Sequence, residues 1–195
     1  MDREQQIAEA EQLLGHAPVH GFVKDLFFGT YNATLANQKE EVDGDEEARL
    51  GHLLEQIGNF LETEVDPAAI DREARVPKRV VQRLFELGVM SMSIPREHGG
   101  LGFSQRAYCR VMEEIGAVDA SIAVLINAHQ SIGMKSLLLF GTPKQQEKGL
   151  PMLSQGRVLS TFALTEPNAG SDAAGIETRA VLNTEGTHYV LNSSG

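Results

Sequence analysis

The residues best suited to chemistry lie in one stretch near the C-terminal end of the chain, residues 165–172, which read TEPNAGSD. Proline removes a backbone donor, and asparagine and glycine tolerate positive φ, so this stretch predicts a tight, folded loop. Such a loop presents backbone N–H groups on one rim, together with the hydroxyls of Thr165 and Ser171. Rims of this kind bind electron-rich groups, such as phosphates or the carbonyl edge of a ring.

The residues before this loop predict the strand that positions it. Residues 158–164, VLSTFAL, are mostly β-branched, aromatic or otherwise apolar. Further on, residues 177–181 and 188–192 predict a β-hairpin around a turn at 183–187. An ordinary strand followed by turn-forming residues would explain TEP or GSD taken alone, because short motifs often match by chance.

Before residue 158 the apolar residues recur at helical spacing. Ser104 and Asp119 are expected N-caps, and Thr142 with Gln145 predicts a capping box. An acidic run at 39–47 predicts a solvated linker. The expected helices cover residues 2–14, 48–65, 77–87, 104–116, 120–140 and 142–154.

The change from helical to strand periodicity predicts a mainly α fold in three parts. Residues 1–44 are expected to form an N-terminal extension with short helices and the acidic linker. Residues 45–157 predict an all-α domain, and residues 158–195 predict the beginning of a β domain.

Residues 120–140 are apolar almost all round, which predicts a helix buried in the middle of a bundle. The same helix carries Asn127, His129, Gln130 and Gly133. Buried polar groups need partners, and a glycine inside a helix costs about 1 kcal/mol relative to alanine. Two interpretations stay open: ordinary packing residues with a helix crossing at Gly133, or a ligand cavity along this face.

The composition excludes several classes of function. The 195 residues carry a net charge of −10, which opposes nonspecific binding to nucleic acid or to an anionic membrane. Cys109 is the only cysteine, so no intrachain disulfide forms, and a reducing, cytoplasmic location is expected. Residues 1–20 lack the pattern of a secretory signal or transit peptide, and no membrane span of about 20 apolar residues is expected. His98 has no second ligand at metal-binding spacing, so no metal site is expected.

Taken together, residues 162–174 closely resemble the flavin-binding signature of the acyl-CoA dehydrogenase family: FALTEP is followed by AGSDAA. Two further stretches support this resemblance in the family's order. Residues 94–102 match an IP-x-x-x-GGLG loop, and AHQSIG at 128–133 is similar to a helix of the family's very-long-chain branch. Residues 21–30 are similar to a segment that leads into the same branch, although a small docking helix explains them equally well.

The resemblance implies a fold, a cofactor and a set of binding residues. It implies an N-terminal helical domain followed by the first strands of the family's middle β domain, and FAD as the cofactor. Ser171 is also expected to approach the CoA pantetheine, and Gly133 to border the tunnel for a long acyl chain. The residues expected to bind the flavin are Phe162, Ala163, Leu164, Thr165, Gly170 and Ser171.

The resemblance also implies a reaction, the α,β-dehydrogenation of an acyl-CoA thioester in fatty-acid β-oxidation. A base removes the α-proton while the β-hydrogen leaves as hydride to the flavin, and electrons pass on to an electron-transferring flavoprotein. The family supplies that base from C-terminal helices, so no catalytic residue is expected in this chain, and Glu166 is not expected to be the base. The full-length form is expected to be a homo-oligomer.

The resemblance covers about the N-terminal half of a family member, so the chain is expected to be a fragment or a truncated product that is inactive alone. Within the same fold, an acyl-CoA oxidase or a flavin monooxygenase is an alternative. From a different class of function, the alternative is a helical acyl-binding or interaction module without catalysis.

Overall fold

The computed structural model describes residues 21–36 and 43–192. The chain divides into two compact units, residues 1–43 and 44–195. The expected helix at 2–14 lies outside the described residues. In the first unit, α2 (Phe22–Phe27) and α3 (Ala33–Ala36) are short. Asn32 begins α3 by accepting hydrogen bonds from Thr34 N and Leu35 N at 3.1 and 3.2 Å.

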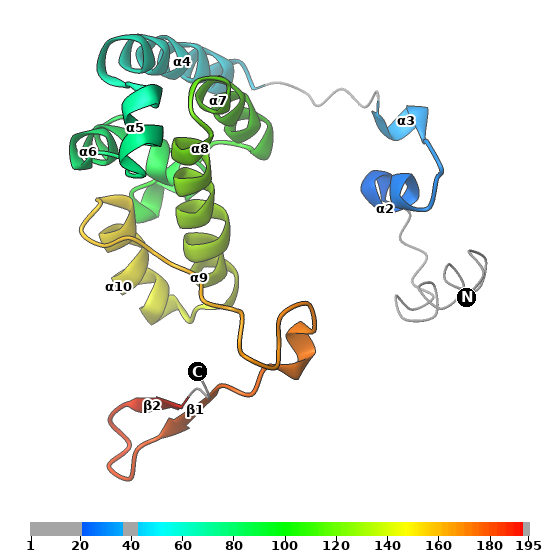
Figure 1. Ribbon diagram of the computed structural model, residues 1–195, viewed down its shortest axis with the longest axis vertical. Helices are drawn as coiled ribbons and strands as arrows, with labels where there is room; N and C mark the ends of the chain where they lie inside the picture. Colours follow the sequence, from blue (N-terminus) through cyan, green and yellow to red (C-terminus); the bar gives the residue numbers. More distant parts are fainter. Residues whose placement is uncertain (1–20, 37–42, 193–195) are drawn as a thin grey trace. The chain divides into compact units, whose positions relative to one another are not determined.

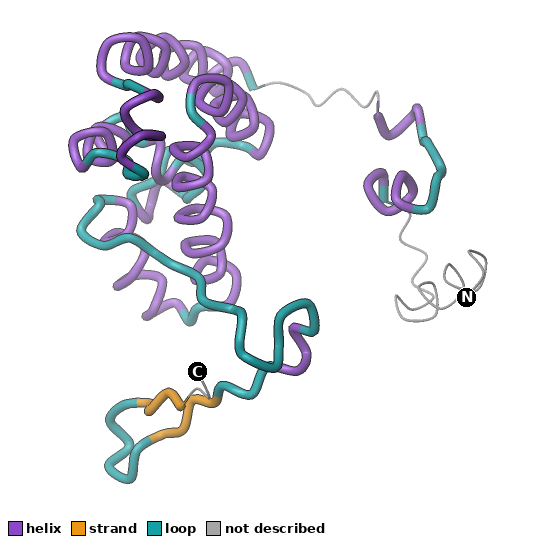
Figure 2. Tube along the Cα trace, in the orientation of Figure 1, coloured by secondary structure: helices purple, strands orange, loops and turns teal. Residues whose placement is uncertain are grey.

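The second unit is a bundle of helices followed by a β-hairpin (Figure 1). Helices, loops and the two strands are distinguished in Figure 2. The connections among the described residues contain the 3₁₀ turns η1 (Val89–Ser91), η2 (Arg96–His98) and η4 (Ala173–Gly175). The helices are α4 (Gly44–Glu64), α5 (Pro67–Glu73), α6 (Lys78–Glu86), α7 (Gln105–Val118), α8 (Ala120–Asn127), η3 (Ala128–Met134), α9 (Lys135–Phe140) and α10 (Pro143–Ser154).

The helix starts follow from their caps, as expected. Ser104 Oγ accepts from Ala107 N at 3.2 Å, and Asp119 Oδ1 accepts from Ile122 N at 2.9 Å. Thr142 and Gln145 form the predicted capping box at the start of α10. One expectation fails: residues 44–47 of the acidic run are not linker but the first turn of α4. Acidic side chains there stabilise the positive end of the helix dipole.

The core lies where α4, α6, α7 and α8 meet. Fully buried residues such as Phe60, Leu84 and Ile122 fill it, and burying each side chain of this size contributes about 1.5–3 kcal/mol. A smaller cluster of Ile94, Met134 and Leu150 joins the loop after η1 to η3 and α10. Both clusters consist of residues that precede position 158, so the core of the helical domain does not include the segment at 158–176.

The helix expected at 120–140 departs from the prediction in two ways. It is interrupted by the π-helical turn η3, and its outer face is not buried: Val124 is 66% exposed, Leu139 63% and Phe140 85%. The prediction of a helix surrounded on all sides is wrong for this chain, because no described residue covers that face. By length and composition alone, Ala120–Phe140 could also cross a membrane, as many core helices of soluble proteins could. The expectation of no membrane span is therefore not confirmed.

The β region forms only in part. The predicted hairpin is present as antiparallel β1 (Arg179–Leu182) and β2 (Tyr189–Asn192), with Arg179 opposite Asn192. The strand predicted at 158–164 is wrong for this chain, since that segment makes no ladder of backbone hydrogen bonds with another described segment and belongs to no sheet. An extended segment becomes a strand only when a neighbour accepts and donates its backbone hydrogen bonds, and no described segment does so here.

Candidate functional site

The loop at 165–172 is folded tightly by its own backbone. Glu166 N–H donates to Ala169 O at 2.9 Å, and Ala169 N–H donates back to Glu166 O at 3.2 Å. Pro167 and Asn168 form the tip of this turn. Asp172 then caps η4, because its carboxylate accepts from Ala174 N at 3.2 Å. The sequence prediction of a tight, folded loop is therefore confirmed.

Glu166 fixes this loop to the residues that lead into β1. Its carboxylate accepts from Glu177 N at 2.8 Å and from Thr178 N at 3.0 Å, and the Thr178 hydroxyl donates to it as well. The hydrogen bond from the Thr178 hydroxyl is the largest cause of a lowered pKa for Glu166. The carboxylate is thus ionised and engaged by donors, which gives Glu166 a structural role in the loop.

The residues predicted to bind the flavin are exposed along one continuous segment (orange in Figure 1). Phe162 is 57% exposed, and Leu164, Thr165 and Ser171 are exposed too. In the part of the chain that the structure describes, the backbone N–H groups of Thr165, Gly170 and Ser171 donate no hydrogen bond. A Cβ added at Gly170 would meet nothing within 4 Å. This rim therefore suits a flat, electron-rich ligand that accepts hydrogen bonds and stacks on apolar side chains.

Gly133 lies against the start of the same segment. A Cβ built on Gly133 would overlap the side chain of Ser160. The glycine therefore permits the close approach of η3 and residue 160. Its predicted role beside an acyl chain stays a prediction.

Gln130 of the AHQSIG motif holds the loop that follows α6. Its side-chain amide donates to Val89 O at 2.6 Å, and its carbonyl accepts from Ser93 N at 3.2 Å. Gln130 is fully buried, and both the nitrogen and the oxygen of its side-chain amide are hydrogen-bonded, so for this residue the packing interpretation is correct. Sequence spacing gave no signal for these partners, which lie about 40 positions earlier in the chain.

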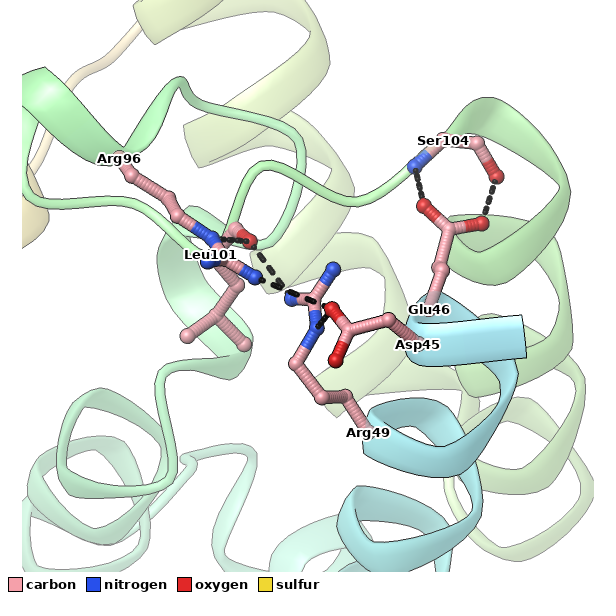
Figure 3. Close-up of polar contacts among 6 residues, drawn as sticks. All are labelled: Asp45, Glu46, Arg49, Arg96, Leu101 and Ser104. Carbon is pink, nitrogen blue, oxygen red and sulfur yellow. Dashed lines mark hydrogen bonds and ion pairs between the residues drawn. The ribbon is translucent and has the colours of Figure 1, made fainter. Parts of the chain in front are cut away.

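The GGLG loop is fastened to the start of α4 (Figure 3). Arg49 donates to Leu101 O at 3.1 Å and pairs with Asp45 at 3.0 Å, and its guanidinium lies 4.8 Å from the centre of the Phe103 ring. Arg96 approaches the same carbonyl and the same carboxylate, at 3.4 and 3.9 Å. These contacts make the loop part of the helical domain.

Hollows lie on the described part of the helical domain. One, of about 290 Å³, lies between α7 and α8, where Tyr108 OH donates to Asn127 Oδ1 at 3.0 Å. Another, of about 530 Å³, lies between α6 and residues 155–159. A third, of about 380 Å³, lies at the GGLG loop, beside Arg96 and Phe103. None of these three is lined by Gly133. Among the described residues, no three His, Cys, Asp or Glu side chains gather as they would around a metal ion.

A family model and curated relatives match this chain. The model of the acyl-CoA dehydrogenase N-terminal domain matches residues 47–157, more than half of the chain. The very long-chain specific acyl-CoA dehydrogenase of Macaca fascicularis is 44% identical over 145 residues, which are 74% of this chain and 22% of the relative. The enzyme of the same name from Mus musculus is 37% identical over 188 residues, 96% of this chain and 29% of the relative. The chain thus spans about a quarter of the length of the curated relatives it matches.

Solved structures share the fold. An acyl-CoA dehydrogenase from Bacillus anthracis, complexed with FAD, is 33% identical with a TM-score of 0.64, over 79% of this chain and 28% of that chain. A chain in the solved structure of the electron transferring flavoprotein of Acidaminococcus fermentans is 28% identical with a TM-score of 0.67. That match covers 80% of this chain and 40% of that chain.

Proposed function

The chain belongs to the acyl-CoA dehydrogenase family, and from this premise we propose that it is the N-terminal part of an FAD-dependent enzyme that dehydrogenates fatty acyl-CoA thioesters. The observation that carries the proposal is the exposed rim at Thr165, Gly170 and Ser171, whose backbone N–H groups make no internal hydrogen bond among the described residues. A folded loop with unused donors is what an anionic or carbonyl-bearing ligand needs.

In this proposal each part of the segment has a distinct task. Phe162 and Leu164 offer apolar surface to a ring, while the N–H and hydroxyl of Thr165 donate to its polar edge. Gly170 and Ser171 donate to a pyrophosphate, since a glycine lets the backbone approach closely. When bound, FAD would supply the hydride acceptor, and donors aimed at its polar edge stabilise the charge that develops there.

The substrate class and the electron acceptor belong to the same proposal. The curated relatives named above are very long-chain specific enzymes, which supports a long acyl chain. The similarity to a chain in an electron transferring flavoprotein structure supports such a flavoprotein as acceptor. The homo-oligomeric state and the cytoplasmic location expected from the sequence stay predictions.

A chimera tests the function. Residues 47–192 of this chain replace the matching segment of the Macaca fascicularis enzyme, and the parent enzyme is the control. The chimera is expected to bind stoichiometric FAD and to reduce an artificial electron acceptor with palmitoyl-CoA in preference to butyryl-CoA. A chimera that matches the parent in circular dichroism and sedimentation, yet holds no FAD, would contradict the proposal.

The 195-residue chain alone is expected to behave differently. Because it spans about a quarter of its relatives, we propose that it binds FAD weakly and does not turn over palmitoyl-CoA. Robust reduction of an acceptor by the chain alone would contradict this. A folded chimera that binds FAD and palmitoyl-CoA without turnover would instead favour the acyl-binding module.

A further inference from the structure

His129 and Ser160 are 31 positions apart in the chain and joined by hydrogen bonds. Ser160 N–H donates to His129 Nδ1 at 3.1 Å, and the Ser160 hydroxyl donates to the backbone carbonyl of His129 at 2.7 Å. The hydroxyl oxygen also lies 3.0 Å from Nδ1. These contacts are called the His129–Ser160 junction below. Among the described residues, they are the last side-chain hydrogen bonds before Phe162 and the exposed rim.

The junction determines where the ring carries its proton. A backbone N–H can only donate, so Nδ1 must offer a lone pair to Ser160 N–H. The neutral ring therefore carries its proton on Nε2. Adding a second proton would place it on Nδ1, which then no longer accepts from Ser160 N–H, so that hydrogen bond breaks. The only acceptor left to the new proton in the junction is the Ser160 hydroxyl oxygen, 3.0 Å away.

The surroundings make the neutral ring the stable one. His129 is 1% exposed, and the Phe85 ring of α6 meets it edge-on with 5.5 Å between ring centres. Nε2 is buried and makes no hydrogen bond of normal geometry. The backbone carbonyl of Leu153, in α10, is the group that raises the pKa of the ring. Burial lowers the pKa of His129 below its ordinary 6.5, and the Leu153 carbonyl opposes this only in part.

No charged side chain of the described residues contributes to this pKa shift. On α6, the charged residues nearest to Phe85 along the chain are Glu86 and Arg83, which pair with each other at 3.0 Å, and Arg83 also lies 3.7 Å from Glu64. The group of α10 that acts on the ring is the Leu153 carbonyl, and the group of the segment after α10 is Ser160. A proton on His129 would thus have no carboxylate to stabilise it.

We propose that His129 and Ser160 are positioning residues: the junction holds the start of the flavin-binding segment on the helical domain, and protonation of His129 releases it. The hydrogen bonds themselves are independent of any ligand. The link to flavin binding rests on the proposed function.

The sign of the pH dependence follows from the direction of the shift. The folded ring has a lower pKa than the unfolded one, so the unfolded chain takes up more protons as the pH falls below about 6.5. The stability that the junction provides is fully present above that pH. It is lost progressively as the pH falls from there through the folded pKa.

Hydrogen exchange of the 195-residue chain tests the junction without flavin or substrate. After correction for intrinsic exchange, the protection of the Ser160 amide is expected to fall about fivefold to tenfold as the pH falls from about 7.5 through the folded pKa of His129, the factor that one hydrogen bond represents. Amides of α4, such as that of Ile57, serve as the internal reference.

A conservative substitution separates titration from packing. In His129→Asn the side-chain oxygen takes the place of Nδ1 and accepts from Ser160 N–H but cannot be protonated. This variant is expected to keep protection at neutral pH and to lose its pH dependence. The same change at the exposed His52 of α4 is the matched control and is expected to leave the pH dependence as in the original chain.

Two results would overturn the proposal. One is a Ser160 amide whose protection in the original chain, after correction for intrinsic exchange, stays the same while the ring of His129 becomes protonated. The other needs no variant: nitrogen chemical shifts that place the proton of the neutral ring on Nδ1. Neither result depends on flavin, so a failed junction and a failed dehydrogenase function are distinguished.

Discussion

The carboxylate of Glu46, in the first turn of α4, accepts two hydrogen bonds from Ser104, the N-cap of α7. The Ser104 N–H donates to one oxygen at 2.8 Å and the hydroxyl donates to the other at 2.6 Å (Figure 3). The residues are 58 positions apart, and their pairing joins the starts of two core helices. One carboxylate thereby fixes the direction in which the chain leaves the GGLG loop.

Replacing Glu46 by glutamine is expected to destabilise the helical domain. The amide keeps the size of the side chain but removes the charge and turns one acceptor into a donor that faces another donor. Lost hydrogen bonds to a partly exposed charged group predict a cost of about 1–2 kcal/mol in the free energy of unfolding, measured with urea. The control is Glu55→Gln on the exposed face of α4, expected to change stability by less than about 0.5 kcal/mol. Equal effects at both positions would contradict the role of the pair.

The same pair predicts a pH dependence. The Ser104 hydroxyl, and then the Ser104 N–H, lower the pKa of Glu46 below its ordinary 4.5. The stability that Glu46 adds is therefore present above that value and is lost as the pH falls through the folded pKa. The difference in unfolding free energy between the original chain and Glu46→Gln is expected to be constant from about pH 7 to about pH 5.5 and to shrink below about pH 4.5. A difference in unfolding free energy that grows as the pH falls would contradict this prediction.

Gly156, just after α10, is expected to be intolerant of a side chain. Its φ is +71°, and an added Cβ would lie 2.7 Å from the Phe85 ring. Gly156→Ala combines about 1–2 kcal/mol for the left-handed conformation with displacement of a ring that packs on His129. Gly58→Ala, inside α4 with open space around it, is the matched comparison and is expected to stabilise by about 0.5–1 kcal/mol. Thermal unfolding of both variants checks the opposite signs.

Caps and the hairpin could be predicted from the sequence because their chemistry is local. Ser104, Asp119 and the Thr142–Gln145 pair each act within three residues, and the hairpin turn lies between its own strands. The strand at 158–164 could not be judged in this way, because sheet formation depends on a neighbouring strand. Its residues suit a strand, but none of the described residues pairs with them.

The long-range part of the site had no sequence signal. His129, Gln130 and Gly133 stood out as polar or small residues in an apolar helix, but nothing in the spacing named Ser160, Val89 or Ser93 as their partners. The π-helical turn at 128–134 brings these residues to their contacts, and such turns often occur at functional sites. The predicted flavin-binding residues remain a prediction, and their exposure is what makes them testable.

The last prediction concerns Thr165 in the chimera described above. Thr165→Val removes the hydroxyl and keeps the shape of an exposed side chain. If the hydroxyl donates to the flavin, FAD affinity is expected to fall about fivefold to tenfold, the equivalent of one hydrogen bond. The melting temperature of the FAD-free protein is expected to stay the same, because an exposed hydroxyl adds little stability. Thr184→Val, in the exposed hairpin turn, is the control. Equal FAD affinity for both variants would remove Thr165 from the binding site while leaving the role of the backbone N–H groups to be tested separately.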